Sequence, residues 1–480
     1  MDSRPDRLPP YAAPLAIALT ALGWWFATSL QPLWWAAWLA PLPVLAYALR
    51  ASGRGSALAT LLAYAIGGAN MWHYLHDVVR LPLPVVLAAI AVPALSMVPA
   101  VLLFRALALR GRLFGALWSL PLAATGLAWA MAALSPHGTY GHIAYSQMDA
   151  LPVLQVAAIT GLWGVGFLVW LLPATLALAG ARGLAARQRG VVLAAGFAVI
   201  GLALAWGTWR LHDDQTGTRL RVGLLNIGEM KDAEADLDQP RGARMLAAYL
   251  AEMDKLAAAG AQVIVAPESA LLLRSQAIAP LQALATRRGV RILIGAEDHS
   301  DPRRKRNAAL VFEPGTSTPA TYYKRHLIPG FEDRYAPGDT HTMLAGTPRI
   351  GVAICKDLDF TATGRAYGQR AAQLLLVPAW DFDDDAWLHG RMAVMRGVEG
   401  GFAMARSARG GHLTLSDDRG RVVAQASSVG TGAPVSLLGE LRLRDTRTLY
   451  TFLGDAFGWL SLLAAIALAL GLFRKRRPVA

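Results

Sequence analysis

Long apolar stretches at both ends of the chain constrain its fold more than any other feature. A helix that crosses a bilayer needs about 20 mostly apolar residues, and such stretches recur through the first 210 residues and once near the carboxyl end. Gly67 and Gly68 interrupt the third stretch and make it the weakest. The sequence therefore predicts a polytopic α-helical membrane domain with about eight spanning helices, at residues 11–30, 32–48, 56–75, 82–104, 113–134, 151–179, 191–209 and 457–473.

Composition excludes the other broad classes of protein. Hydrophobic residues make up 54% of the 480 residues and charged residues only 16%, whereas soluble domains contain about 25% charged residues. Disordered chains show the opposite balance. The single cysteine, Cys355, excludes an internal disulfide.

Basic residues gather at every second connection between the predicted helices. The intervening loops carry almost none, with Arg80 as the exception. By the positive-inside rule, both termini are predicted to be cytoplasmic, and the long segment before the last helix extracytoplasmic. The net charge of +13 is thus interpreted as a topology signal rather than as a sign of nucleic-acid binding. The basic residues concerned are Arg4, Arg7, Arg50, Arg54, Arg105, Arg110, Arg112, Arg182, Arg187, Arg189 and residues 474–477.

Residues 211–449 differ in character from the rest of the chain. They are rich in charge, and short β-type runs alternate with helical stretches such as 241–259 and 276–288. This alternation is typical of an α/β domain. We therefore predict a seven-helix membrane domain at 1–210, an α/β domain at 211–449, and an eighth helix with a basic cytoplasmic tail at 450–480.

Three predicted strand ends carry reactive side chains. Glu268 ends the apolar run 263–268, Lys324 follows a short strand, and Cys355 ends the run 350–355. Because ligands bind at the carboxyl ends of strands in open α/β sheets, we expect these three side chains to meet. A carboxylate can remove the thiol proton, and an ammonium can stabilise the oxyanion that forms when a thiolate attacks a carbonyl.

Taken singly, these residues are weak indicators. A cysteine after an apolar strand is more often a core residue, and a glutamate there is usually at a solvated edge. The combination in this order is more specific. The acidic run 381–385 could bind a divalent ion, but it is interpreted first as a loop whose last aspartate caps the following helix.

The Glu–Lys–Cys order, with its Pro-Glu and Cys-x-Asp contexts, resembles the nitrilase (carbon–nitrogen hydrolase) superfamily. Seven predicted spans before such a domain and one after it resemble the bacterial apolipoprotein N-acyltransferase family. This resemblance implies a nitrilase-like α-β-β-α sandwich for the extracytoplasmic domain. Further similar segments are Tyr145-Ser-Gln-Met-Asp149, the stretch from Leu154 to Phe167, Ile328-Pro-Gly-Phe-Glu332, and the stretch from Asp385 to Glu399.

The resemblance also implies roles for individual residues. Glu268 matches the general base, Lys324 the oxyanion stabiliser and Cys355 the nucleophile. Glu332 matches a second active-site glutamate, and Asp357 the acidic residue two positions after the cysteine. No metal or cofactor is implied.

The chain departs from the family pattern after the cysteine and in the first strand, and the tryptophan that the family places soon after that strand is not found. Lys356 replaces the aromatic residue that usually follows the cysteine, and the first strand reads Leu224-Leu-Asn-Ile-Gly228, without the usual glutamine. Lys356 either lowers the pKa of the thiol or points into solvent, since neighbouring strand residues face opposite sides.

The function implied is transfer of an acyl chain from a phospholipid to the N-terminal amine of S-diacylglyceryl-cysteine apolipoproteins, through a thioester on Cys355. The implied partners are the phospholipid donor, the diacylated acceptor and the bilayer, with the protein in the bacterial inner membrane and its catalytic domain in the periplasm. Two alternatives stay open: a membrane-tethered nitrilase-type amidase acting on a small or peptide amide, and an inactive binding module.

Overall fold

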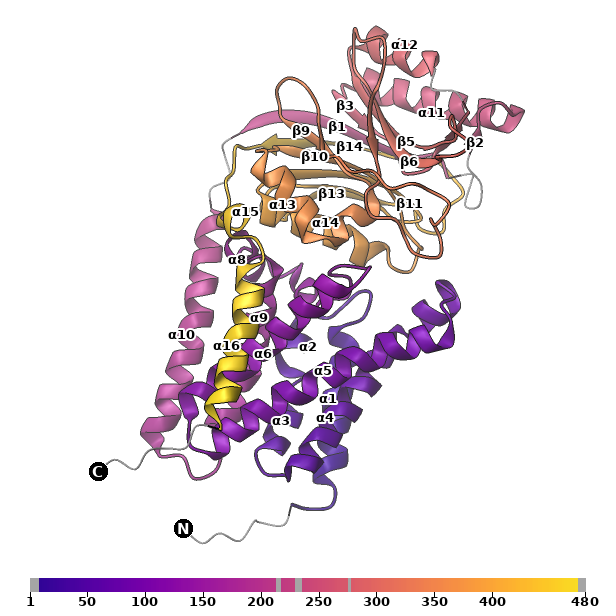
Figure 1. The fold of residues 1–480 in the computed structure, drawn as a ribbon. Helices are drawn as coiled ribbons and strands as arrows, with labels where there is room; N and C mark the ends of the chain where they lie inside the picture. Colours follow the sequence, from indigo (N-terminus) through magenta and orange to yellow (C-terminus); the bar gives the residue numbers. More distant parts are fainter. Residues whose placement is uncertain (1–7, 213–216, 229–234, 275–277, 474–480) are drawn as a thin grey trace. The chain divides into compact units, whose positions relative to one another are not determined.

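The computed structural model describes residues 8–212, 217–228, 235–274 and 278–473, which form two compact units (Figure 1). Unit 1 comprises Met1–Leu134, Gly141–Arg210 and Asp455–Ala480, and unit 2 comprises Ser135–Tyr140 and Leu211–Gly454. The predicted basic residues at positions 4, 7 and 474–477 lie outside the described residues.

Unit 1 is entirely helical in its regular structure. Within the described residues, four of its helices are long and apolar enough to cross a membrane: α5 (Leu83–Leu109), α6 (Leu113–Leu134), α9 (Leu162–Ala179) and α10 (Ala186–Leu211). Shorter apolar helices accompany them, namely α1 (Ala12–Ala27), α4 (Gly53–Gly68), α7 and α8 (Leu151–Leu154 and Ala157–Thr160), and α16 (Ala456–Gly471).

Three of the predicted spans are interrupted. The second is divided at Pro41 into α2 (Trp34–Leu39) and α3 (Leu42–Ala48), because proline starts a helix readily but cannot continue one. The third gives way after Gly68 to a 3₁₀ turn, η1 (Ala69–Met71), and a π turn, η2 (His73–Val78). The sixth is divided at Gly161, whose φ of 68° breaks the helix between α8 and α9. The short 3₁₀ helix η3 (Ile143–Gln147) precedes it.

Small residues bring the helices of unit 1 close together, as is usual in membranes. A Cβ on Gly126 of α6 would lie 2.4 Å from the Cα of Leu462 on α16. A Cβ on Gly67 of α4 would lie 2.8 Å from the carbonyl oxygen of Ala21 on α1. These two contacts leave no room for a side chain between the paired backbones.

Unit 2 contains two sheets packed face to face, each covered by two helices (Figure 1). The eight-stranded sheet consists of β1 (Thr218–Asn226), β2 (Ala235–Asp236), β3 (Val263–Val265), β4 (Leu271–Leu273), β5 (Arg291–Asp298), β6 (Arg306–Phe312), β7 (Ala320–Tyr323) and β14 (Val435–Leu443). The six-stranded sheet consists of β8 (Thr342–Met343), β9 (Ile350–Val352), β10 (Leu374–Trp380), β11 (Ala403–Arg409), β12 (His412–Ser416) and β13 (Val422–Ser427). Helices α11 (Pro240–Ala258) and α12 (Ala279–Arg288) cover the first sheet, and α13 (Thr361–Gln369) and α14 (Ala386–Gly400) cover the second.

The two-residue period of the strands produces these layers. Val265 of β3 and Leu376 of β10 face the core between the sheets. Their neighbours Ile264 and Leu375 face the covering helices on the opposite sides. Because both faces of these strands are buried, their sequences are continuous apolar runs. The layers then follow in the order helices, sheet, sheet, helices.

Strand direction places several strand ends at one edge. Strands β1, β3 and β5 are parallel, and β7 runs the same way as β5 because both are antiparallel to β6. Strands β9, β10 and β11 are parallel in the second sheet. The backbone N–H of Glu268, beyond β3, donates to the carbonyl of Ala379 in β10 at 3.3 Å. The two sheets therefore meet where their strands end.

One short segment of the helical part of the sequence belongs to the α/β unit. Ser135–Tyr140, which follows α6, is part of unit 2. The backbone N–H and the hydroxyl of Thr139 both donate to the carbonyl of Asp359, at 2.9 and 2.7 Å. Sequence reasoning placed this segment within the membrane domain.

We expect Gly126→Val to destabilise unit 1, because the new side chain overlaps the backbone of α16. Overpacking of this kind costs about 1–3 kcal/mol, and thermal unfolding of the detergent-solubilised protein would measure it. Gly201→Val on α10 is the matched control, since a Cβ there meets no atom within 4 Å. Equal unfolding midpoints for the two variants would contradict the close contact of α6 with α16.

Candidate active site

A buried cluster of opposite charges lies where the strands end. The ammonium of Lys324, directly after β7, donates to Glu268 Oε1 at 2.7 Å and to Glu332 Oε1 at 3.0 Å. The Lys324 side chain is 1% exposed and that of Glu268 is 4% exposed. Such charges are stable away from water only when paired and hydrogen-bonded. Two of the three residues expected to meet are therefore in direct contact.

Asn307 completes the cluster, and sequence reasoning missed it. Its Nδ2 donates to Glu268 Oε1 at 2.7 Å and to Glu332 Oε1 at 2.8 Å. The backbone carbonyl oxygen of Asn307 accepts the backbone N–H of Lys324 at 2.8 Å. The only indication in the sequence is an asparagine at the second position of strand β6, directly before an apolar run. One amide thus fixes the separation of two carboxylates.

The thiol of Cys355 lies at the same edge. Cys355 opens the short turn η4 (Cys355–Asp359) after β9 and has a φ of 40°, in the left-handed region that non-glycine residues rarely adopt. Its Sγ lies 3.6 Å from the carbonyl oxygen of Trp380, at the end of β10. Backbone strain of this kind gathers at functional sites. The turn places the sulfur at the strand ends, where Cys355 is buried and packs with the core between the sheets.

The pKa values suit a thiol that needs a base. Burial, followed by the negative charge of Glu268, raises the pKa of the Cys355 thiol well above its ordinary value. Burial and the neighbouring Glu332 also raise the pKa of Glu268, although Lys324 opposes the shift. Burial disfavours the charge of Lys324, but Glu268 and Glu332 outweigh it and raise its pKa. The site therefore holds a neutral thiol, a strengthened carboxylate base and a permanent cation.

Asp357 links the nucleophile turn to the segment after Lys324. Its fully buried carboxylate accepts the hydroxyl of Tyr322 at 2.7 Å and the backbone N–H of Ile354 at 3.0 Å. It also accepts the backbone N–H groups of Arg325 and His326 at 3.0 and 2.8 Å. Burial opposes ionisation, but the bonds from His326 and Tyr322 hold the pKa of this carboxyl below its usual value. Asp357 therefore orients the turn and does not face a reacting atom in these contacts.

One of the two interpretations of Lys356, that it points into solvent, is wrong. The side chain is buried, with Nζ 3.1 Å from Nδ1 of His137 and 3.5 Å from the carboxylate of Asp359, so it does not point into solvent. Burial and Glu268 are the largest causes of the raised pKa of the Cys355 thiol, and an effect of Lys356 on this pKa stays a prediction. Since His137 lies in the segment Ser135–Tyr140, Lys356 connects the nucleophile turn to that segment.

A second buried ion pair adjoins the thiol. Arg406 of β11 binds Asp381 in a bidentate manner, at 2.8 and 2.5 Å. Asp381 and Arg406 are both among the charges that act on the pKa of Cys355. Sequence reasoning interpreted the run 381–385 as a capping loop, but no cap bond forms: the Asp385 carboxylate accepts the N–H of Phe382 at 3.0 Å instead. A helix cap is a local pattern, whereas Arg406 is 25 residues away in sequence.

His389 belongs to the same group of charges. Its Nδ1 lies 2.8 Å from the Asp385 carboxylate. Burial lowers the pKa of His389, but Asp385 outweighs it and raises the pKa to about 9. Asp381, Asp385 and His389 present possible ligand atoms within 4.8 Å of one another. Arg406 and a protonated His389 already supply the positive charge that these two carboxylates require.

Two family models match the chain. Residues 232–449 match the carbon-nitrogen hydrolase model, and residues 20–175 match the model of the apolipoprotein N-acyltransferase N-terminal domain. The apolipoprotein N-acyltransferase of Geobacter metallireducens is 27% identical, over 80% of this chain and 79% of its own length. The omega-amidase NIT2 of Homo sapiens is 30% identical, over 23% of this chain and 44% of its own length. Among solved structures, an amidase from Nesterenkonia sp. has a TM-score of 0.40 at 20% identity, covering 47% of this chain and 92% of that chain.

We expect Asn307→Ala to raise the pKa of Glu268 further, because the amide hydrogen bond that lowers it is lost. A hydrogen bond to a charged group contributes about 1.5–3 kcal/mol, which corresponds to roughly one to two pH units. The acid limb of the pH profile for iodoacetamide alkylation should move to higher pH by this amount. Cys355 is the only cysteine, so alkylation reports on it alone.

Asn70→Ala in unit 1 is the control for the asparagine change. It should leave the alkylation profile unchanged, because Asn70 binds the carbonyl of Trp25 within the helical unit. An unchanged profile in Asn307→Ala would show that Glu268 does not activate the thiol.

Proposed function

Since the chain belongs to the apolipoprotein N-acyltransferase family, we propose that it transfers an acyl chain from a phospholipid to the N-terminal amine of S-diacylglyceryl-cysteine apolipoproteins. The observation that carries the proposal is one buried Glu268–Lys324–Cys355 site in a chain that also has four apolar helices long enough to span a membrane.

The first step forms an acyl-enzyme. Glu268 removes the proton of the Cys355 thiol as the sulfur attacks the ester carbonyl of the phospholipid. Lys324 and the backbone N–H of Lys356 stabilise the tetrahedral oxyanion. The C–O bond then breaks, Glu268 returns the proton to the departing oxygen, and a lysophospholipid leaves. The acyl group remains on Cys355 as a thioester.

The second step transfers the acyl group to nitrogen. The α-amine of the diacylated acceptor attacks the thioester carbonyl while Glu268 accepts a proton from the amine. The C–S bond breaks, the thiolate recovers that proton, and an amide is formed. Glu332 and Asn307 act by positioning, since they hold Lys324 and Glu268 in place through both steps.

Membrane residence suits both proposed substrates. Burial of a lipid chain contributes about 0.8 kcal/mol per CH₂ group, so extracting a whole chain into water would cost far more than an enzyme can recover in each turnover. An enzyme with its own spanning helices receives both lipids without leaving the bilayer.

The amidase alternative has one observation in its favour, namely the partial identity with omega-amidase NIT2. An amidase would use the same three residues, with water as the acceptor of the acyl group. The acyltransferase relative covers 80% of this chain and the omega-amidase relative 23%, and we therefore favour acyl transfer.

An inactive binding module fits the site less well. A buried ammonium between two carboxylates is costly to desolvate. A cysteine with positive φ adds strain beside it. Neither feature is needed for binding alone.

We expect phospholipid alone to give a stable acyl adduct on Cys355 and release one lysophospholipid, measured by intact-protein mass spectrometry. Cys355→Ala should give none, and Cys355→Ser almost none, because a serine hydroxyl is much harder to deprotonate than a thiol. Glu268→Gln should slow adduct formation about 10²–10⁴-fold through loss of the base. Glu252→Gln on α11 is the matched control and should react normally.

Addition of a diacylated lipopeptide with a free α-amine should discharge the adduct, and an N-blocked lipopeptide should not. Stability without the amine is expected because an acyltransferase has to keep water away from the thioester. If the adduct hydrolyses equally fast with and without the lipopeptide, the amidase alternative is correct.

We also propose that the protein resides in the bacterial inner membrane with both termini in the cytoplasm and unit 2 in the periplasm, because of its alternating basic loops. A reporter fused after residue 480 should be cytoplasmic, and one inserted at residues 303–306 should be periplasmic. A cytoplasmic signal from the inserted reporter would overturn this topology.

A further inference from the structure

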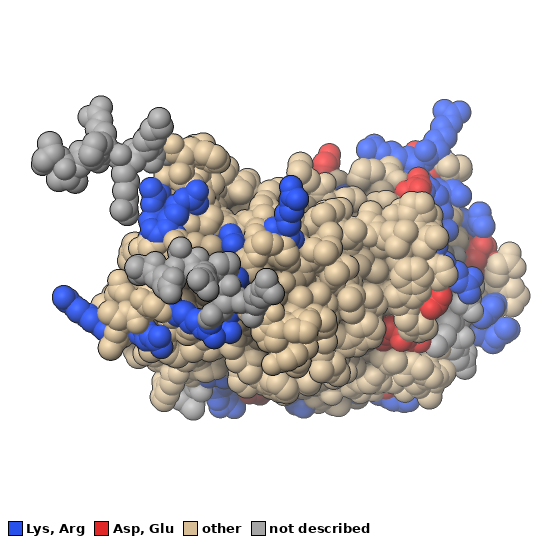
Figure 2. All heavy atoms as spheres, turned by 90° about the horizontal axis from the view of Figure 1, so that it is seen from below, with Lys and Arg blue, Asp and Glu red and all other residues tan. Residues whose placement is uncertain are grey.

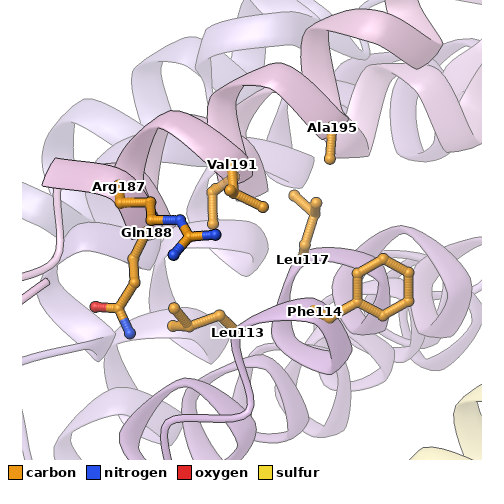
Figure 3. Close-up of a pocket in the computed structure, with 8 residues that line it drawn as sticks. Leu113, Phe114, Leu117, Arg187, Gln188, Val191 and Ala195 are labelled. Atoms are coloured by element: carbon orange, nitrogen blue, oxygen red, sulfur yellow. The ribbon is translucent and has the colours of Figure 1, made fainter. Parts of the chain in front are cut away.

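A groove between two membrane helices of unit 1 has no part in the proposed reaction. It lies between the amino-terminal turns of α6 and α10 and has a volume of about 310 Å³ (Figure 3). This is at the lower end of the range of about 300–1,000 Å³ for small-molecule sites. Its walls include Leu113, Phe114 and Leu117 from α6 and Arg187, Val191 and Ala195 from α10.

The groove has an apolar wall and a cationic end. In Figure 3 the guanidinium of Arg187 turns into the space between the helices. Gln188 is the other polar residue of the lining, and leucine, valine, phenylalanine and alanine side chains form the rest. A site of this composition is complementary to a molecule with a hydrocarbon chain and a negative head.

The end of unit 1 that contains Arg187, which we call the basic end, has no carboxylate among its described residues that could neutralise this guanidinium. The described part of unit 1 as a whole has three acidic residues, Asp77, Asp149 and Asp455. Asp77 comes before α5, whose 27 residues span about 40 Å and lead toward the basic end. Asp149 comes after the carboxyl end of α6, whereas the amino-terminal turns of α6 line the groove. Asp455 begins α16, and the opposite end of that helix reaches the basic end through the bond from Arg112 to the carbonyl of Gly471, at 2.6 Å.

The basic end of unit 1 therefore carries an excess of positive charge. Figure 2, which views the protein from below, shows Lys and Arg side chains standing among uncharged ones. The two helix amino termini add partial positive charge. Anionic lipid headgroups provide about 1 kcal/mol per Lys or Arg close to a membrane surface. Arginines at these helix ends include Arg105, Arg110, Arg112, Arg182, Arg187 and Arg189.

We propose that this groove binds one anionic phospholipid, with an acyl chain between α6 and α10 and the phosphate on Arg187. None of the residues that line the groove is among those of the proposed acyl-transfer site. On α10 they lie between Arg187 and Ala195, so they are about 24–36 Å along the helix from its carboxyl end at Leu211.

The lipid would support a helix that has few other contacts. Only 22% of the apolar 18-residue stretch of α10 is buried inside the protein. Its close approaches are at Gly196, against Thr175 of α9, and at Gly207, against the carbonyl of Pro152. A lipid between α6 and α10 fills the space beside the amino-terminal turns, and we expect the thermal stability of the full chain to depend on it.

The test compares phosphatidylglycerol with phosphatidylethanolamine, each added to the delipidated full-length protein in detergent. Binding is followed by native mass spectrometry and the unfolding midpoint by thermal shift. Wild type should bind phosphatidylglycerol more tightly and gain stability from it. Arg187→Gln should weaken that binding about five-fold, while Arg187→Lys should retain most of it. Arg54→Gln, an exposed arginine in the first turn of α4, should behave as wild type.

A second variant tests the apolar wall. Ala195→Phe should fill the groove and reduce retention of phosphatidylglycerol without changing any charge. Glycerophosphoglycerol, which lacks acyl chains, should not compete. Equal losses in Arg187→Gln and Arg54→Gln would reveal only general surface attraction, and equal binding of the two lipids would show that charge plays no part; either result overturns the proposal. Neither readout depends on acyl transfer, so the proposed function stands or falls separately.

Discussion

Lys324 holds its ammonium group, almost completely buried, between the carboxylates of Glu268 and Glu332. Removing one partner of a buried ion pair costs about 3–5 kcal/mol because the other charge stays uncompensated. The residues come from the end of β3, the end of β7 and the segment beyond it, so all three have to reach one point in the folded chain. Asn307 on β6 ties the two carboxylates together. The strand register of the first sheet is therefore coupled to the electrostatics of the site.

The second sheet brings the nucleophile to this cluster. Asp357 accepts bonds from the turn that holds Cys355 and from the segment after Lys324, so a single carboxylate joins the two sheets' contributions. Burial is the largest cause in both cases, and it raises the pKa of the thiol and the pKa of its proposed base. A neutral thiol beside a carboxylate of raised pKa is suited to proton transfer at the moment of attack, and an isolated thiolate is not required.

The helical unit obeys different constraints, because lipid replaces water as its solvent. Its helices approach closely where glycine removes a side chain, as Gly126 does against α16. Where packing is loose, as along α10, the bilayer itself supplies the neighbouring atoms. The basic end lacks carboxylates among its described residues, and it is where we propose that an anionic lipid binds. Lipid is thus the proposed substrate at one site and a proposed structural component at another.

Much of this organisation was predictable from sequence. Apolar runs located the membrane helices because the bilayer imposes a length and a composition. Continuous apolar strands that end in Glu268, before Lys324, and in Cys355 indicated the α/β unit and its edge. These features are local in the chain, so a pattern of neighbouring residues is enough to show them.

Tertiary structure alone decided which other residues share the site. Asn307, the pair of Arg406 with Asp381, and the contact of Lys356 with His137 join positions from 25 to 219 residues apart. No periodicity or spacing encodes such contacts, because they depend on strand register and on which loop returns to the sheet edge. The sequence by itself determined which segments are suited to lipid and which to water, and which reactive side chains follow the strands. Folding determined their partners, since a buried charge is compensated only by groups that the fold brings within hydrogen-bonding distance.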